Sequence, residues 1–374
     1  MNNINQCTCS VIPPHILRHL AGGSDADARN TARQTLEEMH LIARKRERRT
    51  LLEQQSAEAP GGSTQRNVYD AQHHRSLPGK LVRSGSDPQS TDAEVNEAFD
   101  GSGVTGDFYK TVFSRLSIDG KGMPINATVH YGRNFDNAMW NGEQMVYGDG
   151  DGKLFNRFTS SLDVIGHELT HGVTQYTAAL QYSGQTGALN EHISDAFGIM
   201  VKQYALGLTA NQSDWLIGAG LLAKGVKGKA IRSMAAPGTA YDDPRLGRDP
   251  QPARMHDYVV TTDDGGGIHI NSGIPNRAFY LAAIAIGGTT WPVLGRVWYD
   301  TLTTRLQPDA KFRDFAQATI AMAGDLFGPD GRVQKAIVNA WKTVGLVPRT
   351  NSVWRRRRSK STPSPERQKK GEAQ

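Results

Sequence analysis

His167, Glu168 and His171 form an H-E-x-x-H pattern. Of the residue patterns in this sequence, it is the one that most clearly indicates a chemical function. On a helix, residues at i and i+4 lie on the same face, so the two imidazoles can bind one metal ion. Glu168 lies about 100° around such a helix, where its carboxylate can reach a water on the metal without becoming a ligand. The spacing predicts a metal-binding helix that carries its own base. The alternative is a helix in which these residues coincide by chance.

A third ligand can come from a second helix, which we expect to begin near Asn190, shortly after the first. It would place Glu191 beside the two histidines. Two imidazoles and one carboxylate leave one tetrahedral position open, as in catalytic rather than structural zinc sites. Asp195 follows Glu191 at i+4, on the same face, and we expect it to accept the other ring N–H of His167.

These side chains must be positioned by two different kinds of structure. Residues 67–161 contain short apolar stretches between Gly, Asn and Asp turns, and residues 125–131 and 144–147 are typical of strands. One helix, near residues 92–117, is expected to interrupt this part, with the glycines at 101–106 breaking or bending it. The rest of the folded chain has helical periodicity. The expected helices there are 162–176, 190–205, 274–286, 293–304, 312–327 and 333–344.

Composition limits the class of protein. The chain has 374 residues, enough for two folded units with appendages, and no apolar run of transmembrane length. Its formal net charge of +6 comes from residues 351–374, where eight basic residues stand against two acidic ones. The remainder is neutral, so no nucleic-acid surface is expected on the folded body. Residues 349–374 are expected to be a basic, disordered tail.

The N-terminal region is expected to be separate from the rest. Residues 11–17 are typical of an extended apolar segment, because consecutive prolines restrict the backbone. Residues 25–55 favour a helix. We assign 1–56 to this region and 57–66 to a flexible linker with a proteolytic site.

Cys7 and Cys9 are the only cysteines in the chain, so the fold does not depend on an internal disulfide. The first eleven residues lack a basic segment followed by an apolar one. No ordinary secretory signal is therefore visible. We expect a cytoplasmic protein or one exported by a non-standard route.

Several motifs in the right order resemble the thermolysin-like zinc metalloendopeptidases. The resemblance runs from about Tyr69 to Val347. The motifs are Asn137-Ala138-Met139-Trp140-Asn141-Gly142, residues 145–152 (MVYGDGDG), His167-Glu168-Leu169-Thr170-His171, Asn190-Glu191 with Ser194-Asp195, and residues 267–273 (GIHINSG). The short N-terminal region with its Pro-Pro motif is similar to that of the protealysin subgroup, whose members have a short propeptide.

The resemblance implies an α+β fold: a β-rich N-terminal half at 67–161, a mainly α-helical half at 162–348, and a zinc cleft between them. It implies one catalytic zinc held by His167, His171 and Glu191, with Asn190 and Asp195 around the ligands. Glu168 would take a proton from zinc-bound water and later return it to the leaving amine. His269 and Tyr182 match the groups that stabilise the developing oxyanion, and Asp264 matches the carboxylate that orients His269.

Substrate contacts are implied in the same way. Asn137 and Ala138 match the residues that hold a peptide extended, and Arg232 matches the residue that binds a substrate carbonyl. The S1′ pocket would be lined by Phe155, Phe158, Val164 and Ile231. The implied activity is cleavage of peptides and proteins, by a monomer, on the amino side of large hydrophobic residues. Pro13, Pro14 and His15 would lie at the cleft and block it.

The chain departs from many relatives at their double calcium site. Asp163 and Asp214 match two of the acids of that site, but three other positions are Lys202, Leu216 and Ala219. These side chains offer no hard oxygen donor. We expect the double site to be lost, with room for at most one weak calcium.

Three alternatives stay open at this point. The chain could be a catalytically silent binding protein with the same fold, or an adaptor whose basic tail binds anionic partners. Within the enzyme hypothesis, Cys7 or Cys9 could occupy the open zinc position as a thiolate switch.

Overall fold

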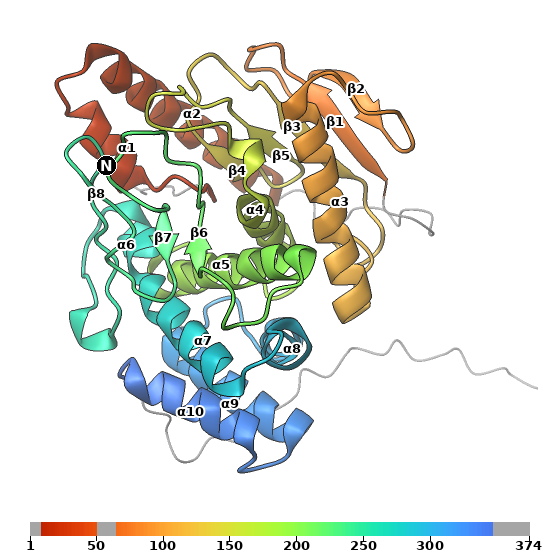
Figure 1. The fold of residues 1–374 in the computed structure, drawn as a ribbon, viewed down its shortest axis with the longest axis vertical. Coiled ribbons are helices and arrows are strands. Elements are labelled where there is room, and N and C mark those ends of the chain that lie inside the picture. The colour runs from red at the N-terminus through yellow and green to blue at the C-terminus, as the bar shows by residue number, and fades with distance from the viewer. Residues whose placement is uncertain (1–8, 51–64, 347–374) are drawn as a thin grey trace, which may run out of the picture.

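The computed structural model describes residues 9–50 and 65–346, with the backbone alone at 45–50. The tail predicted at 349–374, most of the linker predicted at 57–66, and Cys7 lie outside the described residues. Within them the fold is the expected one, with a mixed sheet in the N-terminal half and a helical C-terminal half (Figure 1). Among the described residues, no helix combines the length and apolarity that crossing a bilayer requires.

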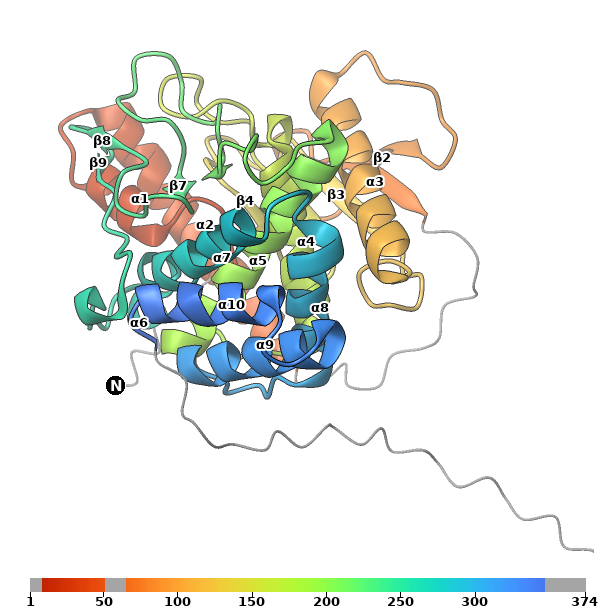
Figure 2. The same ribbon diagram turned by 60° about the horizontal axis from the view of Figure 1, so that its bottom comes forward.

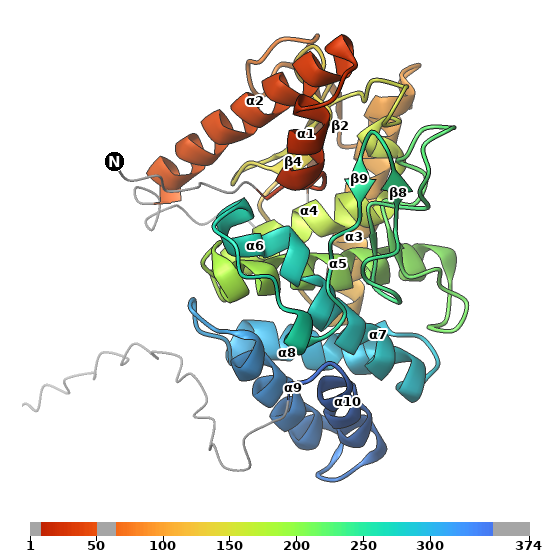
Figure 3. The ribbon, with the colours of Figure 1, turned by 90° about the vertical axis from the view of Figure 1, so that its left-hand side faces the viewer.

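The N-terminal segment forms two helices, α1 (Pro14–Ala21) and α2 (Ala26–Thr50). Pro13 is extended, with φ −65° and ψ 147°, and Pro14 begins the helix, since proline lacks only an N–H that the first turn does not use. The extended segment predicted at 11–17 was therefore wrong beyond Pro13. Figure 3 shows α1 and α2 on the same side of the molecule as strand β4 (Ala138–Trp140), away from helices α9 (Phe312–Phe327) and α10 (Arg332–Thr343).

Five strands form one sheet in the order β2-β1-β3-β5-β4. The pairs β1–β3 and β3–β5 are parallel, whereas β2 and β4 are antiparallel to their neighbours. The edge strand β4 thus leaves one side free to pair with another segment. The strands are β1 (Arg66–Asp70), β2 (Lys80–Ser84), β3 (Ile125–Val129), β4 (Ala138–Trp140) and β5 (Met145–Tyr147).

Helix α3 (Ala93–Phe113) is continuous, so of the break or bend expected at 101–106 the break was wrong. Its glycines serve close packing. A Cβ at Gly101 would lie 2.3 Å from Ile165 Cδ1 of α4, and one at Gly103 would lie 2.0 Å from the Arg66 guanidinium. The intrinsic cost of glycine in a helix, about 1 kcal/mol each, is offset by the close approach of α3 to its neighbours.

The C-terminal half is built on α4 (Leu162–Gln175) and α5 (Gly184–Leu206), which begins six residues before the predicted start. Figure 2 shows the last helices stacked beneath α5 and α7. Short strand pairs and 3₁₀ or π turns link these helices. The remaining elements are η1 (Phe158–Ser160), β6 (Leu216–Ile217), β7 (Arg232–Ser233), β8 (Asp242–Asp243), β9 (Gly247–Arg248), η2 (Met255–Asp257), α6 (Asp264–Asn271), α7 (Gly273–Ile286), η3 (Trp291–Gly295), α8 (Arg296–Thr304), α9 (Phe312–Phe327) and α10 (Arg332–Thr343).

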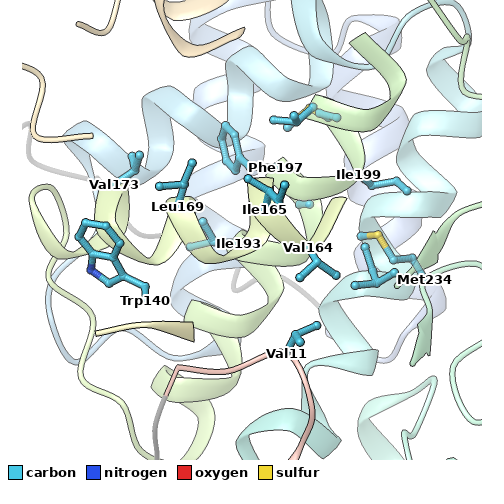
Figure 4. Packing of buried hydrophobic residues seen from close by; sticks show 14 of the residues in the cluster. Val11, Trp140, Val164, Ile165, Leu169, Val173, Ile193, Phe197, Ile199 and Met234 are labelled. Carbon is cyan, nitrogen blue, oxygen red and sulfur yellow. The ribbon is translucent and has the colours of Figure 1, made fainter. Parts of the chain in front are cut away.

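Helices α4 and α5 cross at a pair of glycines. A Cβ at Gly166 would lie 3.1 Å from Gly198 Cα, and one at Gly198 would lie 2.4 Å from the Asp163 carbonyl oxygen. Larger residues would force the helices apart. Around this crossing, apolar side chains of both helices are buried together (Figure 4). The helix faces that carry the predicted ligands are therefore held at a fixed separation.

Candidate active site

The three predicted ligands meet between α4 and α5. His171 Nε2 lies 3.1 Å from His167 Nε2 and 3.3 Å from Glu191 Oε1, and His167 Nε2 lies 3.5 Å from Glu191 Oε2. All three side chains are fully buried. Ligand atoms this close, with two nitrogens facing each other, match one small cation at their centre.

The outer ring nitrogens are held by acceptors. Asp195 Oδ1 lies 2.8 Å from His167 Nδ1, and Asn190 Oδ1 lies 2.8 Å from His171 Nδ1. Because carboxylate and amide oxygens accept, each Nδ1 carries the hydrogen and each Nε2 keeps its lone pair. Ser194 Oγ lies 3.1 Å from His171 Nδ1 and was missed by the sequence analysis. This orientation is the one that metal-binding histidines need.

Electrostatics favour a cation at the centre. Burial by itself would raise the pKa of Glu191, but His269 and His171 outweigh it and hold that pKa well below its ordinary value. Three buried atoms of this site have no hydrogen-bond partner among the described residues: Glu168 Oε1, Glu191 Oε2 and His269 Nε2. Two imidazoles and a carboxylate fit zinc, the metal that the family resemblance implies.

Glu168 stands beside the ligands as predicted from its place on the helix. The backbone N–H of Trp140 in β4 donates to Glu168 Oε2 at 2.9 Å. Complete burial raises the pKa of the Glu168 carboxyl, and its Oε1 stays free for a proton. The Trp140 contact was not predicted, since it depends on the edge strand lying against α4.

His269 approaches from α6, whose first turn is irregular. Gly265, Gly266 and Gly267 have φ of 58°, 95° and 75°, values that glycine tolerates best. This turn lets Asp264 reach back to both the N–H of His269 (2.8 Å) and its Nδ1 (2.7 Å). Burial lowers the pKa of His269, but Asp264 and Glu191 raise it to about 9 overall. The bond from Nδ1 to Asp264 favours the protonated form of His269, in which Nε2 can also donate.

Tyr182 lies beside Glu191 and His269. Its hydroxyl donates to Glu191 Oε1, and its ring lies 6.4 Å from the ring of His269. The structure thus brings both predicted oxyanion donors next to the ligand group.

The predicted substrate contacts surround residues 11 and 12 of the chain itself. The N–H of Val11 donates to the Ala138 carbonyl at 3.1 Å. The amide of Asn137 accepts from the N–H of Ile12 at 2.9 Å and donates to its carbonyl at 3.1 Å. Arg232 Nη1 donates to the carbonyl of Val11 at 3.0 Å.

The Val11 side chain lies next to Val164 of the predicted S1′ pocket (Figure 4). The other predicted lining residues, Phe155, Phe158 and Ile231, are also buried. The guanidinium of Arg232 is fixed from behind by Asp195, at 2.8 to 3.2 Å. Asp195 thus serves His167 and Arg232 together, a link that the sequence analysis did not predict.

The predicted inhibitory motif lies at the N-terminus of α1. Pro13 and Pro14 are followed by His15, whose Nε2 lies 2.9 Å from the hydroxyl of Tyr241. All of this motif except His15 is fully buried. The N-terminal segment therefore enters the cleft as an extended strand and leaves it as a helix.

Asp163 and Asp214, the two acids matched to the calcium site of relatives, both lie near the side chain of Lys202. Lys202 Nζ lies 2.9 Å from Asp214 Oδ2 and 3.8 Å from Asp163 Oδ2. Its ammonium neutralises charge where relatives with the double site bind an ion. Loss of that site remains a prediction.

Comparisons with known proteins agree with this geometry. The family model described as "Thermolysin metallopeptidase, catalytic domain" matches residues 33–175, and the model of the thermolysin α-helical domain matches 178–346. An extracellular metalloprotease of Pectobacterium carotovorum is 51% identical over 339 residues, covering 90% of this chain and 96% of that protein. Protease PrtS of a Photorhabdus strain is 46% identical and covers 90% of this chain and 91% of that protein.

A solved structure is similar over most of its length. The precursor of protealysin, a metalloproteinase from Serratia proteamaculans, superposes with a TM-score of 0.82 at 49% identity. The alignment covers 90% of this chain and 99% of that one.

Proposed function

The chain belongs to the thermolysin family of zinc metallopeptidases, and from this premise we propose that it is a latent endopeptidase whose own N-terminal segment occupies the active-site cleft. His167, His171 and Glu191 would hold one zinc ion. When bound, zinc supplies Lewis acidity: it polarises a peptide carbonyl and lowers the pKa of a water from about 15.7 towards 7.

Glu168 is assigned the role of general base. Its Oε1 has no hydrogen-bond partner among the described residues, while Oε2 is fixed by the Trp140 N–H. Burial raises the pKa of Glu168, which makes its carboxylate a better proton acceptor. It would take a proton from the attacking water and pass it to the nitrogen of the departing amine.

His269 and Tyr182 are assigned to the oxyanion that forms at the carbonyl. His269 is held protonated by Asp264, so it can donate from Nε2. Each donor aimed at the developing charge typically contributes about 10²-fold or more to the rate.

The observation that carries the proposal is the pose of Val11 and Ile12. Four backbone groups of these two residues are bonded to Ala138, Asn137 and Arg232. A peptide bound in this way adds a strand to the edge of β4. Because Val11 fills the apolar pocket, its amino side, the Ser10–Val11 bond, stands where cleavage is expected. Preference for hydrophobic residues at this position follows from the pocket lining.

Residues 9–50 are proposed to act as a propeptide. Val11, Ile12, Ile16 and Leu17 are completely buried, and each such side chain contributes about 1.5–3 kcal/mol when removed from water. Farther along, Tyr131 donates to Glu38 of α2 at 2.6 Å. The segment thus docks on the sheet as well as in the cleft. Removal near residues 55–66 would open the cleft.

The test compares the purified full-length chain with its Glu168→Gln variant, and with Glu37→Gln as a matched control on the exposed face of α2. Wild type and Glu37→Gln should shorten near residues 55–66 by mass spectrometry and cleave casein until a zinc chelator is added. Glu168→Gln should remain full length and retain one zinc. A wild-type chain that is shortened yet shows no chelator-sensitive cleavage would instead identify a silent binding protein.

A further inference from the structure

Cys9 reaches the ligand group from the propeptide. Ser10 pairs with Met139 as an antiparallel bridge. One residue back along this register, Cys9 stands opposite Trp140, whose N–H holds Glu168. The Cys9 side chain is only 1% exposed. The sulfur is therefore enclosed at the deep end of the cleft.

The partner of this sulfur is His171. A hydrogen bond joins Cys9 to the imidazole of His171. The Nδ1 of His171 is already engaged by Asn190 at 2.8 Å. Cys9 thus faces the Nε2 side, the same nitrogen that lies 3.1 Å from His167 Nε2.

Independent evidence for a cation at this point comes from the residues of the catalytic half. Glu168 Oε1, Glu191 Oε2 and His269 Nε2 are buried without hydrogen-bond partners among the described residues, and the last two lie 3.6 Å apart. The zinc-ligand group supplies three donors. A thiolate is the donor that zinc most readily accepts to complete a tetrahedral set.

We propose that Cys9 is the fourth zinc ligand of the precursor and takes the position that the attacking water needs. The inference rests on the zinc site proposed above. On coordination the thiol releases its proton to solvent and one water leaves the site, so the step changes no oxidation state. Latency then has two parts: the strand pose of residues 10–12 excludes substrate, and the sulfur excludes water. Exclusion of water by the Cys9 sulfur also explains why the Ser10–Val11 bond, although held like a substrate, would not be cleaved.

Zinc X-ray absorption provides the direct test, since Zn–S distances of about 2.3 Å are resolved from Zn–N and Zn–O distances of about 2.0–2.2 Å. Three full-length proteins are compared: Glu168→Gln, which does not process itself, and the same protein with either Cys7→Ser or Cys9→Ser. A single sulfur shell is expected for Glu168→Gln and for the Cys7→Ser form, and none for the Cys9→Ser form. In the chain with Glu168 intact, Cys9→Ser should speed self-processing severalfold, whereas Cys7→Ser should not.

The result for the Cys7→Ser form needs no change at Cys9, so it decides the matter even if Cys9→Ser fails to fold. One bound zinc with nitrogen and oxygen neighbours alone would overturn the role of Cys9 and leave the zinc site intact. Loss of the sulfur shell in the Cys7→Ser form would also overturn it. Absence of bound zinc from all three proteins would instead refute the proposed function.

Discussion

Two groups of histidine and acidic side chains in this protein have similar donor atoms but different surroundings. One consists of His167, His171 and Glu191, and the other of Glu94, His130 and Asp149. The first is completely buried, whereas side chains of the second are 16–29% exposed. The distances between ligand atoms do not distinguish the two groups, because within each group these atoms lie within 4.8 Å of one another.

The difference lies in how the ring nitrogens are used. In the buried group, acceptors outside it hold each Nδ1, so two Nε2 lone pairs face inward. In the other group, His130 bonds Asp149 through Nδ1 at 3.0 Å and Asp92 through Nε2 at 2.8 Å. These carboxylates raise the pKa of His130 to about 10. With both ring nitrogens bonded to carboxylates, His130 has no lone pair left for a metal ion. The second group is therefore a charge cluster in which His130 is the cation.

Removing one histidine from each group should give the largest contrast. His171→Ala should lose the bound zinc and, with it, several kcal/mol of transition-state stabilisation, or about 10³-fold in activity or more. His130→Ala should keep one zinc and most of the activity. Metal analysis and peptide hydrolysis measure both, after an added protease has removed the N-terminal segment from each protein. A second zinc that disappears in His130→Ala would break the distinction.

Asp195→Asn tests whether the orienting acceptor defines the metal site. Loss of its charge should weaken zinc binding about 10–100-fold, because His167 Nδ1 loses its carboxylate partner. It also leaves the fully buried Arg232 without its anion, which should lower the free energy of unfolding by about 3–5 kcal/mol. Zinc competition titration and urea unfolding are the measurements, in the Glu168→Gln background.

The matched change in the other cluster is Asp149→Asn. Asp149 is 29% exposed and His130 retains Asp92, so zinc affinity should not change and the loss of stability should be smaller. Equal losses in the two variants would contradict the comparison.

The features that can be predicted from the sequence are those that depend on residues close together in the chain. His167, His171 and Glu168 are within one helix, so their relative placement depends only on helix geometry. The fold class was predictable too, through the motif resemblance, and is confirmed. By contrast, the Trp140 N–H on Glu168 and the reach of Cys9 to His171 depend on strand register, which no local pattern encodes.

One error has this origin. The glycines in α3 suggested a break, but Gly101 leaves room for the Ile165 side chain of another helix. Ile165 is distant in sequence and becomes a neighbour of Gly101 only in the folded chain.

The charge cluster should weaken in alkali. His130 has a folded pKa of about 10 against 6.5 in the unfolded chain, so its stabilisation is complete below pH 6.5 and is lost as pH rises towards 10. Burial and Asp149 also raise the pKa of Glu94 to about 8. The contribution of Glu94 to stability therefore also falls as the pH rises. In the Glu168→Gln background, the stability advantage of His130 over His130→Gln should therefore shrink between pH 6.5 and 10. A constant difference in urea midpoint would count against the charged His130.

His15 should respond to pH with the opposite sign and with a smaller effect. Burial lowers its pKa to about 4, and the hydroxyl of Tyr241 is its neutral partner. The charged and titratable groups that act on it are Asp264, His269, Arg232 and Arg18. Asp264 favours the proton and the other three oppose it, so His15 is neutral when docked. Its contribution is complete above pH 6.5 and is lost as pH falls towards 4, by at most about 1.4 kcal/mol for each pH unit.

The measurement is urea unfolding of the full-length Glu168→Gln protein between pH 7.5 and 4.5, with and without His15→Gln. Glutamine cannot take a proton, so the His15 protein should lose stability faster as the pH falls. Parallel curves would show that His15 has the same pKa in the folded and unfolded chain, which would contradict a pKa lowered by burial. Diverging curves would mean that acid loosens the propeptide, while the charge cluster, in which the pKa of His130 is raised, does not share that response.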